Sequence, residues 1–361
     1  MRKSVLIIGT GTIGEPLIGL LSDFKEELEV ENVFFYKRTP LLDEVAKVNC
    51  MIDSGAKLVV TDKKNKKSFT DLGNEVSGYF KDVLKEVDVI VDCTPAGNQN
   101  KELYYLPLLA EKAAKGETPP LFVAQGSEKG FGVPYAHGIN DSVLENLNTD
   151  FVQVVSCNTH NIARLIAAVS SIGKIMQGDF VCMRRSNDVS QDIGYVPSTT
   201  VSNHSDPKCG THHARDVHDL LKTVGKSTIV YSSALKINTQ YMHSIRFSLQ
   251  LKNRVTTTQV IESFEEDKLI ATTYKNSANK IFSFGRDHGY YGRIFNQTVI
   301  PIESVATFRK PRSGTLITGF CFTPQDGNSL LSSTAAVARV TLGKDYLKRL
   351  DFMNELLFDF I

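Results

Sequence analysis

Cys157 stands where a nucleophile could be both positioned and activated. An apolar run at residues 151–155 ends at Ser156, and apolar residues then recur three and four apart, which predicts a helix. We expect Cys157 to cap this helix, where unpaired backbone N–H groups and the positive end of the helix dipole would stabilise a thiolate. The simpler alternative is a small buried apolar side chain, which is the commoner role of a cysteine.

The polar residues that support the interpretation of Cys157 as a nucleophile lie further along the chain. Arg184 and Arg185 precede a loop at residues 186–210 that is rich in Gly, Pro, Ser and Asn, and His212 and His213 follow it. A long loop between two strands is uncommon without a function. Paired arginines and paired histidines suit an anionic substrate such as a phosphate.

His243 is the candidate for the acid/base that a cysteine nucleophile needs, although a lone histidine inside a strand pattern is more often a satisfied core residue. Zinc is a rival interpretation of the other histidines. Their spacing fits no common four-ligand pattern, so we expect no metal. The residues that a zinc site would draw on are His204, Cys209, His212, His213 and His218.

The beginning of the chain predicts a dinucleotide-binding turn. A strand at residues 5–8 leads into a GxGxxG motif made by Gly9, Gly11 and Gly14, and a helical pattern follows. In this context the glycines permit a tight turn and a close approach to a pyrophosphate, which the helix N-terminus faces.

The second strand indicates which dinucleotide would bind. Where an NAD site usually has a carboxylate, this chain has Lys37, Arg38 and Thr39. Cationic side chains here favour NADP over NAD, because they can bind a 2′-phosphate. The alternative is a pair of solvated charges at the end of a strand.

Composition excludes several classes of protein. The chain has 361 residues, enough for two domains, and its 41 Lys+Arg nearly balance its 40 Asp+Glu, so nothing indicates nucleic acid or an anionic membrane as partner. Six cysteines without a CxxC pair suit reduced thiols. No apolar run reaches the length of a signal-peptide core or a membrane span, so we expect a cytoplasmic protein.

The pattern of elements predicts an α/β fold with two domains. Alternating strands and helices in the first half favour a Rossmann-type, doubly wound parallel sheet, and runs of strands in the second half favour an α+β catalytic domain on a mixed or antiparallel sheet. We expect a charged loop at residues 62–67 and an amphipathic helix at 345–358. The predicted domains are 1–156 for dinucleotide binding and 157–334 for catalysis, with a C-terminal helix at about 335–361 packing back on the first.

Taken in order, these motifs resemble the archaeal-type (class II) phosphorylating glyceraldehyde-3-phosphate dehydrogenases over nearly the whole chain. The resemblance implies that Cys157 is the nucleophile and His243 the acid/base. It is carried by the motif at 9–14, Lys37-Arg38-Thr39-Pro40, Gln125-Gly126-Ser127-Glu128-Lys129, residues 154–159, Arg184-Arg185, His212-His213, Met242-His243 and Gln325.

The resemblance also implies which residues would surround the substrate and the cofactor. On the substrate side would lie Ser156, Asn158, His212 and His213, to which we add Arg184. The cofactor would be lined by Thr12, Ile13, Gly126, Ser127, Arg185 and Gln325, in addition to the glycines of the motif and residues 37–39.

The chain departs from the usual family pattern at four places, all outside the catalytic pair. The family usually has glycine where Ser127 stands, and a second histidine where Ile245 stands. It has His-His-Gly-Pro-Asp where residues 212–216 read His-His-Ala-Arg-Asp, and His-Gln-Glu-Ser where residues 324–327 read Pro-Gln-Asp-Gly. These changes bear on the substrate and on the nicotinamide pocket.

The activity that the resemblance implies is the reversible, phosphorylating oxidation of D-glyceraldehyde 3-phosphate to 1,3-bisphosphoglycerate through a cysteine thioester, as in glycolysis and gluconeogenesis. NADP or NAD would be the cofactor, and a phosphorylated aldehyde and inorganic phosphate the substrates of a homotetramer that binds neither nucleic acid nor membrane. Two alternatives remain. One is a semialdehyde dehydrogenase or acyl-CoA reductase on the same scaffold, and the other is a non-catalytic dinucleotide-binding protein.

Overall fold

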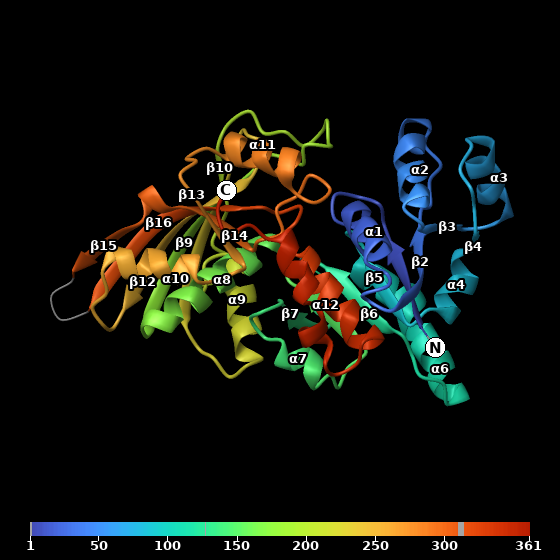
Figure 1. The fold of residues 1–361 in the computed structure, drawn as a ribbon, viewed down its shortest axis with the longest axis horizontal. Helices are drawn as coiled ribbons and strands as arrows, with labels where there is room; N and C mark the ends of the chain where they lie inside the picture. The colour runs from blue at the N-terminus through green and yellow to red at the C-terminus, as the bar shows by residue number, and fades with distance from the viewer. Residues whose placement is uncertain (1, 127, 310–313) are drawn as a thin grey trace. The chain divides into compact units, whose positions relative to one another are not determined.

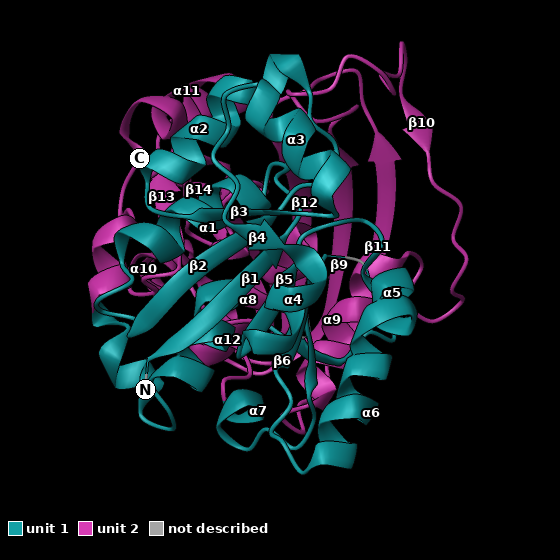
Figure 2. Ribbon diagram, turned by 90° about the vertical axis from the view of Figure 1, so that its right-hand side faces the viewer, with its two compact units in different colours: residues 1–135, 142–154, 332–351 teal, residues 136–141, 155–331, 352–361 magenta. Residues whose placement is uncertain are grey.

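The computed structural model describes residues 2–126, 128–309 and 314–361. The chain divides into two compact units, which Figure 2 colours separately, and neither is a continuous stretch of chain. Unit 1 contains residues 1–135, 142–154 and 332–351, and unit 2 contains residues 136–141, 155–331 and 352–361.

Unit 1 is built on a parallel sheet of eight strands with the order β4-β3-β2-β1-β5-β6-β8-β7, of which Figure 1 labels β2 to β7. Every strand pair in it is parallel, and the central strands are buried along most of their length, which explains their nearly continuous apolar sequences. The predicted doubly wound sheet is confirmed. Its strands are β1 (Lys3–Ile8), β2 (Val30–Tyr36), β3 (Lys57–Val60), β4 (Gly78–Tyr79), β5 (Val89–Asp92), β6 (Leu121–Gln125), β7 (Val133–Tyr135) and β8 (Phe151–Val154).

The strand order reverses at β1, which pairs with β2 on one side and with β5 on the other. In open α/β sheets, ligands bind outside the carboxyl ends of the strands at such a switch point. The helical segments of this unit are α1 (Gly14–Asp23), η1 (Leu42–Glu44), α2 (Val45–Asp53), α3 (Lys63–Asp71), α4 (Phe80–Glu86), α5 (Gly97–Asn100), the π-helical turn η2 (Lys101–Tyr105), α6 (Leu106–Lys115), α7 (Ser142–Glu145), most of α12 (Leu330–Thr341) and η4 (Tyr346–Arg349).

Unit 2 contains a mixed sheet with the order β10-β11-β9-β12-β16-β14-β13, and β15 pairs with β16. The predicted second domain with a mixed sheet is confirmed in this respect. Its strands are β9 (Ile175–Arg184), β10 (Thr200–Val201), β11 (Ile229–Lys236), β12 (His243–Leu251), β13 (Ile270–Thr273), β14 (Thr298–Pro301), β15 (Ala306–Arg309) and β16 (Thr315–Thr323). Its helical segments are α8 (Cys157–Ile172), α9 (His212–Lys222), α10 (Thr257–Glu265), α11 (Ala278–His288), η3 (Ile302–Ser304) and η5 (Asp351–Leu356).

One face of this second sheet is covered by α8, α9 and α10, which pack on one another and on the sheet (Figure 1). Side chains alternate between the two faces of a strand, so the inward residues of β9, β12 and β16 form the core with the apolar sides of the helices. Core members include Leu165, Phe180, Val217, Phe247, Val260 and Ile317.

Two elements differ from the sequence predictions. The charged segment at 62–67, predicted as a loop, begins helix α3, because the carboxylate of Asp62 accepts a hydrogen bond from the N–H of Asn65 and so caps it. The helix predicted at 345–358 is instead two 3₁₀ segments, η4 and η5. Its apolar spacing did reflect burial, since Leu350 and Met353 are both buried.

Candidate active site

Cys157 is the first residue of α8, and Ser156 before it occupies the N-cap position. The prediction that Cys157 itself caps the helix is therefore wrong by one residue. The side chain of Ser156 bonds to that of Thr159 at 2.9 Å, so the N-cap hydroxyl does not cap the backbone. Cys157 is partly buried, and its carbonyl accepts a hydrogen bond from Asn328 at 2.9 Å.

The predicted activation of Cys157 by the helix terminus is outweighed. Burial raises the pKa of the Cys157 thiol to about 11, although the charge of Arg185 acts in the opposite direction. The carboxylate of Asp326 raises this pKa further, whereas the N–H of Asn158 lowers it, as expected at a helix start. Together these effects favour the thiol form of Cys157 at neutral pH, against the thiolate expected from the helix terminus alone.

His243 begins β12 and is held by hydrogen bonds on two sides. Its Nδ1 accepts from the backbone N–H of Arg185 at 2.9 Å, and its own backbone N–H donates to Oε1 of Gln325 at 2.9 Å. Burial lowers the pKa of His243 well below its usual value, and the nearby charges of Arg185 and Arg184 act in the same direction. The imidazole is therefore neutral at physiological pH.

Arg185 is buried, and its guanidinium is paired with two carboxylates. It forms an ion pair with Asp188 and lies 3.2 Å from Asp326, and it also donates to the carbonyl of Tyr241. Its predicted role in lining the cofactor remains a prediction. The sequence did not reveal that Asp188 and Asp326 pair with Arg185. Asp326 is separated from Arg185 by 141 positions in the chain.

Arg184, His212 and His213 form a polar group near the catalytic candidates, in which Arg184 is the cation. Arg184 has no side-chain hydrogen bond or ion pair with any residue that the structure describes, and its charge affects the pKa of Cys157, His213 and His243. The rings of His212 and His213 lie 3.9 Å apart between centroids, at the start of α9. A helix N-terminus beside a free arginine suits an anion, as the sequence predicted for a phosphate.

The two histidines differ in burial. His213 is 3% exposed, and its Nδ1 pairs with the hydroxyl of Thr211 at 3.1 Å. Burial lowers the pKa of His213 to about 3, and the neighbouring His212 and Arg184 act in the same direction. His213 is therefore a neutral hydrogen-bonding group.

Asn158, also predicted on the substrate side, is almost fully buried. Its side-chain oxygen accepts from the hydroxyl of Thr323 at 3.2 Å, and Asn161 donates to the same hydroxyl at 2.8 Å. This chain of bonds joins the first turn of α8 to the end of β16. It fixes the segment that carries Cys157.

In unit 1, the dinucleotide motif lies between β1 and α1 as predicted. Gly9 has a φ of +95°, and a Cβ on Gly14 would come within 2.1 Å of the Gly9 carbonyl oxygen, so both positions require glycine. Gly11, Thr12 and Ile13 complete the same turn, with Ile13 as the N-cap residue of α1. This is the close packing of helix on strand that the motif serves in dinucleotide-binding proteins.

A cavity adjoins this turn, at the strand switch point. Its volume is about 540 Å³, and its lining includes Gly9, Lys37, Arg38 and Thr39 among the predicted residues. The sequence missed its aromatic wall, in which the rings of Tyr36 and Phe80 stack at 4.3 Å and Tyr104 meets Phe80 edge to face.

The two cations after β2 are not equivalent. Lys37 is 9% exposed, and its ammonium is paired with Glu44. Burial opposes the charge on Glu44, but hydrogen bonds from Lys37 and Lys47 keep its pKa below the usual value. Arg38 is exposed, and its side chain has no partner among the described residues. Arg38 is thus the cation available for a ligand.

The remaining predicted cofactor residues lie elsewhere. Gly126 follows β6 with a φ of +74°, and its carbonyl accepts from Gln153 at 3.0 Å. Ser127 lies outside the described residues. Gln325 is 8% exposed and contacts His243, as described above.

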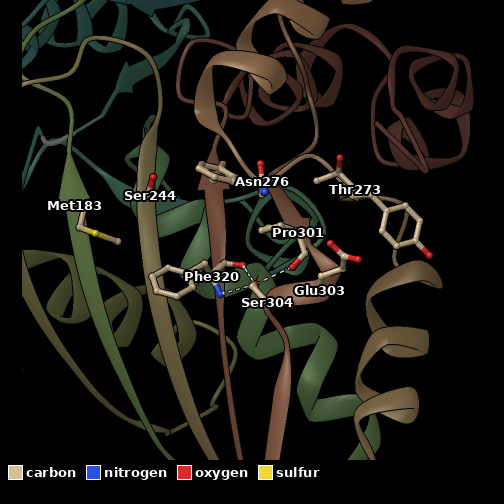
Figure 3. A pocket seen from close by; sticks show the side chains of 10 residues that line it. Met183, Ser244, Thr273, Asn276, Pro301, Glu303, Ser304 and Phe320 are labelled. Atoms are coloured by element: carbon tan, nitrogen blue, oxygen red, sulfur yellow. Dashed lines mark hydrogen bonds between the residues drawn. The ribbon is translucent and has the colours of Figure 1, made fainter.

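A second cavity, of about 460 Å³, lies on the face of the unit 2 sheet opposite α8 (Figure 3). Met183 and Ser244 line this cavity and directly precede or follow Arg184 and His243 in the sequence. Because side chains alternate along a strand, Met183 and Ser244 point to the opposite face of the sheet from Arg184 and His243. Ser304 is satisfied within it, donating to Pro301 and accepting from the N–H of Phe320.

The residues that the structure describes contain neither a metal-binding cluster nor a membrane-spanning helix. No group of three or more His, Cys, Asp or Glu side chains, those at 204–218 included, is arranged to hold a metal ion. Within the same residues, no helix has the length and hydropathy needed to cross a bilayer.

Comparison with known proteins gives consistent relatives over most of the chain. Proteins named glyceraldehyde-3-phosphate dehydrogenase from Methanopyrus kandleri and Archaeoglobus fulgidus are each 30% identical, over 79% and 80% of this chain and 78% and 79% of their own. The protein of the same name from Methanocaldococcus jannaschii is 29% identical over 84% of this chain and 85% of its own. No protein-family model matches the chain.

Proposed function

Because the chain belongs to the glyceraldehyde-3-phosphate dehydrogenase family, we propose that it catalyses the reversible, phosphorylating oxidation of D-glyceraldehyde 3-phosphate to 1,3-bisphosphoglycerate with NADP or NAD. The observation that carries the proposal is the grouping, within unit 2, of Cys157 and His243 with the unpaired cation of Arg184. A nucleophile, a polarising group and an anion site are the three parts that this reaction needs.

The proposed mechanism begins when the sulfur of Cys157, as the minor thiolate form, attacks the aldehyde carbon. A C–S bond forms, and the resulting oxyanion is held by His243 and by N–H groups at the start of α8. A nicotinamide cofactor bound in unit 1 would supply the acceptor for the hydride that must leave this carbon to give the thioester. Inorganic phosphate then attacks the thioester carbon, the C–S bond breaks, and the thiolate of Cys157 is regenerated with release of the acyl phosphate.

Arg184, together with His212 and His213, would bind the phosphate of the substrate or the attacking phosphate. A guanidinium can donate two parallel hydrogen bonds to phosphate oxygens, and a neutral histidine can add a third. Ser156 and Asn158 would shape the same side. This assignment explains why an arginine pair and a histidine pair flank the loop at 186–210.

The cofactor would bind in unit 1, at the cavity beside the motif of Gly9, Gly11 and Gly14. We propose NADP as the preferred form, because the described residues that line the cavity include no acidic side chain and Arg38 is free to bind a 2′-phosphate. Lys37 would act less directly, since Glu44 already neutralises it. Gly126, Ser127, Arg185 and Gln325 are the further cofactor contacts that the resemblance implies.

The homotetramer and the cytoplasmic location belong to the same proposal. The outer face of the unit 2 sheet exposes Ile229, Phe308 and Phe320, which are 70%, 53% and 42% accessible. Exposed apolar side chains on one sheet face favour burial against a second copy of the chain. Phe320→Glu should then yield smaller species in light scattering, whereas Leu42→Glu, at an exposed site of unit 1, should not.

The decisive assay is reduction of NADP and of NAD by the purified protein with glyceraldehyde 3-phosphate, with and without inorganic phosphate or arsenate. Phosphate-dependent reduction that Cys157→Ser abolishes, with cofactor binding kept, would support the proposal. Activity with a CoA thioester or with a semialdehyde instead would favour a related enzyme on the same scaffold. Absence of any activity would favour a non-catalytic dinucleotide-binding protein.

A further inference from the structure

The contacts of His243 leave its imidazole only one neutral form. A backbone N–H can only donate a hydrogen bond, so the Nδ1 that accepts from Arg185 at 2.9 Å carries a lone pair and no proton. The proton of the neutral ring must then be on Nε2. Protonation of Nδ1 would place two donors face to face and break this bond.

The groups that impose this form are themselves fixed. Gln325 is 8% exposed, accepts from the backbone N–H of His243 and donates its own backbone N–H to the carbonyl of Thr323 at 2.9 Å. Arg185 is held through its guanidinium by Asp188 and Asp326. The first residue of β12 is thus bound between the segments that follow β9 and β16.

We propose that the Arg185 N–H and Gln325 fix His243 as a hydrogen-bond donor through Nε2, and that Gln325 is a positioning residue for His243. The inference rests on the proposed function for the reaction it serves. His243 then stabilises the oxyanion by donation, and it does not remove the thiol proton. Cys157 loses that proton to solvent before the attack, so protons balance without an imidazolium.

The form of the ring can be measured without turnover. In protein labelled with ¹⁵N-histidine, long-range ¹H–¹⁵N correlations distinguish a bare ring nitrogen from a protonated one, and His243→Gln assigns the signals. We expect a bare Nδ1 and a protonated Nε2 throughout the range from about pH 6 to 9. A protonated Nδ1, or a His243 that titrates near pH 6.5, as an unperturbed histidine does, would overturn the proposal.

The role of Gln325 is tested by Gln325→Met, which keeps the length of the side chain and removes the acceptor. We expect kcat to fall about 10–100-fold, as for a misplaced catalytic group, and by a larger factor than any rise in the Kd for the cofactor. Gln325→Glu keeps an acceptor oxygen and should restore part of the loss. Gln250→Met makes the same change near the other end of β12 and should leave kcat as in the unchanged protein.

The opposite pattern refutes the assignment. A raised Kd for the cofactor with kcat unchanged would place Gln325 in the cofactor site, as the resemblance implies. If the protein oxidises no aldehyde, the proposed function fails, but the NMR measurement still decides the proposal. Gln325→Met should then replace the single ring form of His243 by a mixture, and retention of one form would reject the positioning role.

Discussion

Cys157 provides the sharpest test of how this site works, because two physical effects predict different behaviour. The helix terminus alone would depress the pKa of the thiol, whereas burial raises it to about 11. An ordinary cysteine, with a pKa near 8.5, is about 3% thiolate at pH 7, and a pKa of 11 reduces this fraction to about 0.01%. The structure therefore predicts a resting thiol that reacts about 300 times more slowly than an ordinary one.

The assay is alkylation by iodoacetamide, followed by mass spectrometry of the peptide that contains Cys157. The rate should rise about tenfold with each pH unit and show no plateau below about pH 10, because only the thiolate reacts. Cys157→Ser reports the background of the other thiols, of which Cys50 is the exposed one. The same slope should appear in kcat/KM for aldehyde oxidation, since burial keeps His243 neutral across this range.

A plateau of the alkylation rate below pH 8 would refute the reasoning. It would show that the N–H of Asn158 and the charges of Arg184 and Arg185 outweigh burial. Asp326→Asn offers an independent check, because it removes a carboxylate that raises the pKa of Cys157. The alkylation rate at pH 7 should rise in this variant, and an unchanged or lower rate would contradict the electrostatic account.

Three further predictions concern single side chains. Arg38→Ala should raise the Kd of NADP about tenfold and leave that of NAD unchanged, because one exposed charge-assisted contact is worth about 1.5 kcal/mol; equal effects on both cofactors in a fluorescence titration would contradict it. Arg184→Gln should raise KM for glyceraldehyde 3-phosphate at least about tenfold and that for unphosphorylated glyceraldehyde much less. Burial lowers the pKa of His160 to about 4. Because the unfolded chain binds a proton at this residue at higher pH than the folded chain does, the free energy of unfolding should fall by about 3 kcal/mol as the pH drops from 6.5 to 4. Urea unfolding at several pH values should show this loss, and His160→Asn should make the free energy of unfolding less dependent on pH in this range.

The parts of the fold that the sequence predicted are those set by local patterns. Apolar runs of strand length, the glycines at 9–14 and the helical spacing after Cys157 all depend on neighbours within a few residues. The helix at 63–71 was missed because its sequence is nearly all polar, and a single cap and one buried residue, Phe69, define it. The segment at 345–358 was misread because spacing reports burial, whichever kind of helix achieves it.

The missed features of the site depend on contacts between distant segments. Glu44 neutralises Lys37, and Asp326 pairs with Arg185, yet a carboxylate in a sequence carries no sign of the cation that it will meet. The pKa of Cys157 was misjudged for the same reason. A helix start can be recognised locally, but burial of its first residue depends on the completed fold.

The division of the chain has a consequence for how the protein can be made. The chain passes between the units after residues 135, 141, 154, 331 and 351, so no single cut releases either unit whole. Helix α12 is tied into unit 1 by Ser333, which accepts from Gln125 at 2.6 Å, and by Arg339, which donates to the carbonyl of Leu144 at 2.7 Å. On a ribosome that synthesises the N-terminus first, unit 1 must therefore remain without helix α12 until nearly all of unit 2 has been translated.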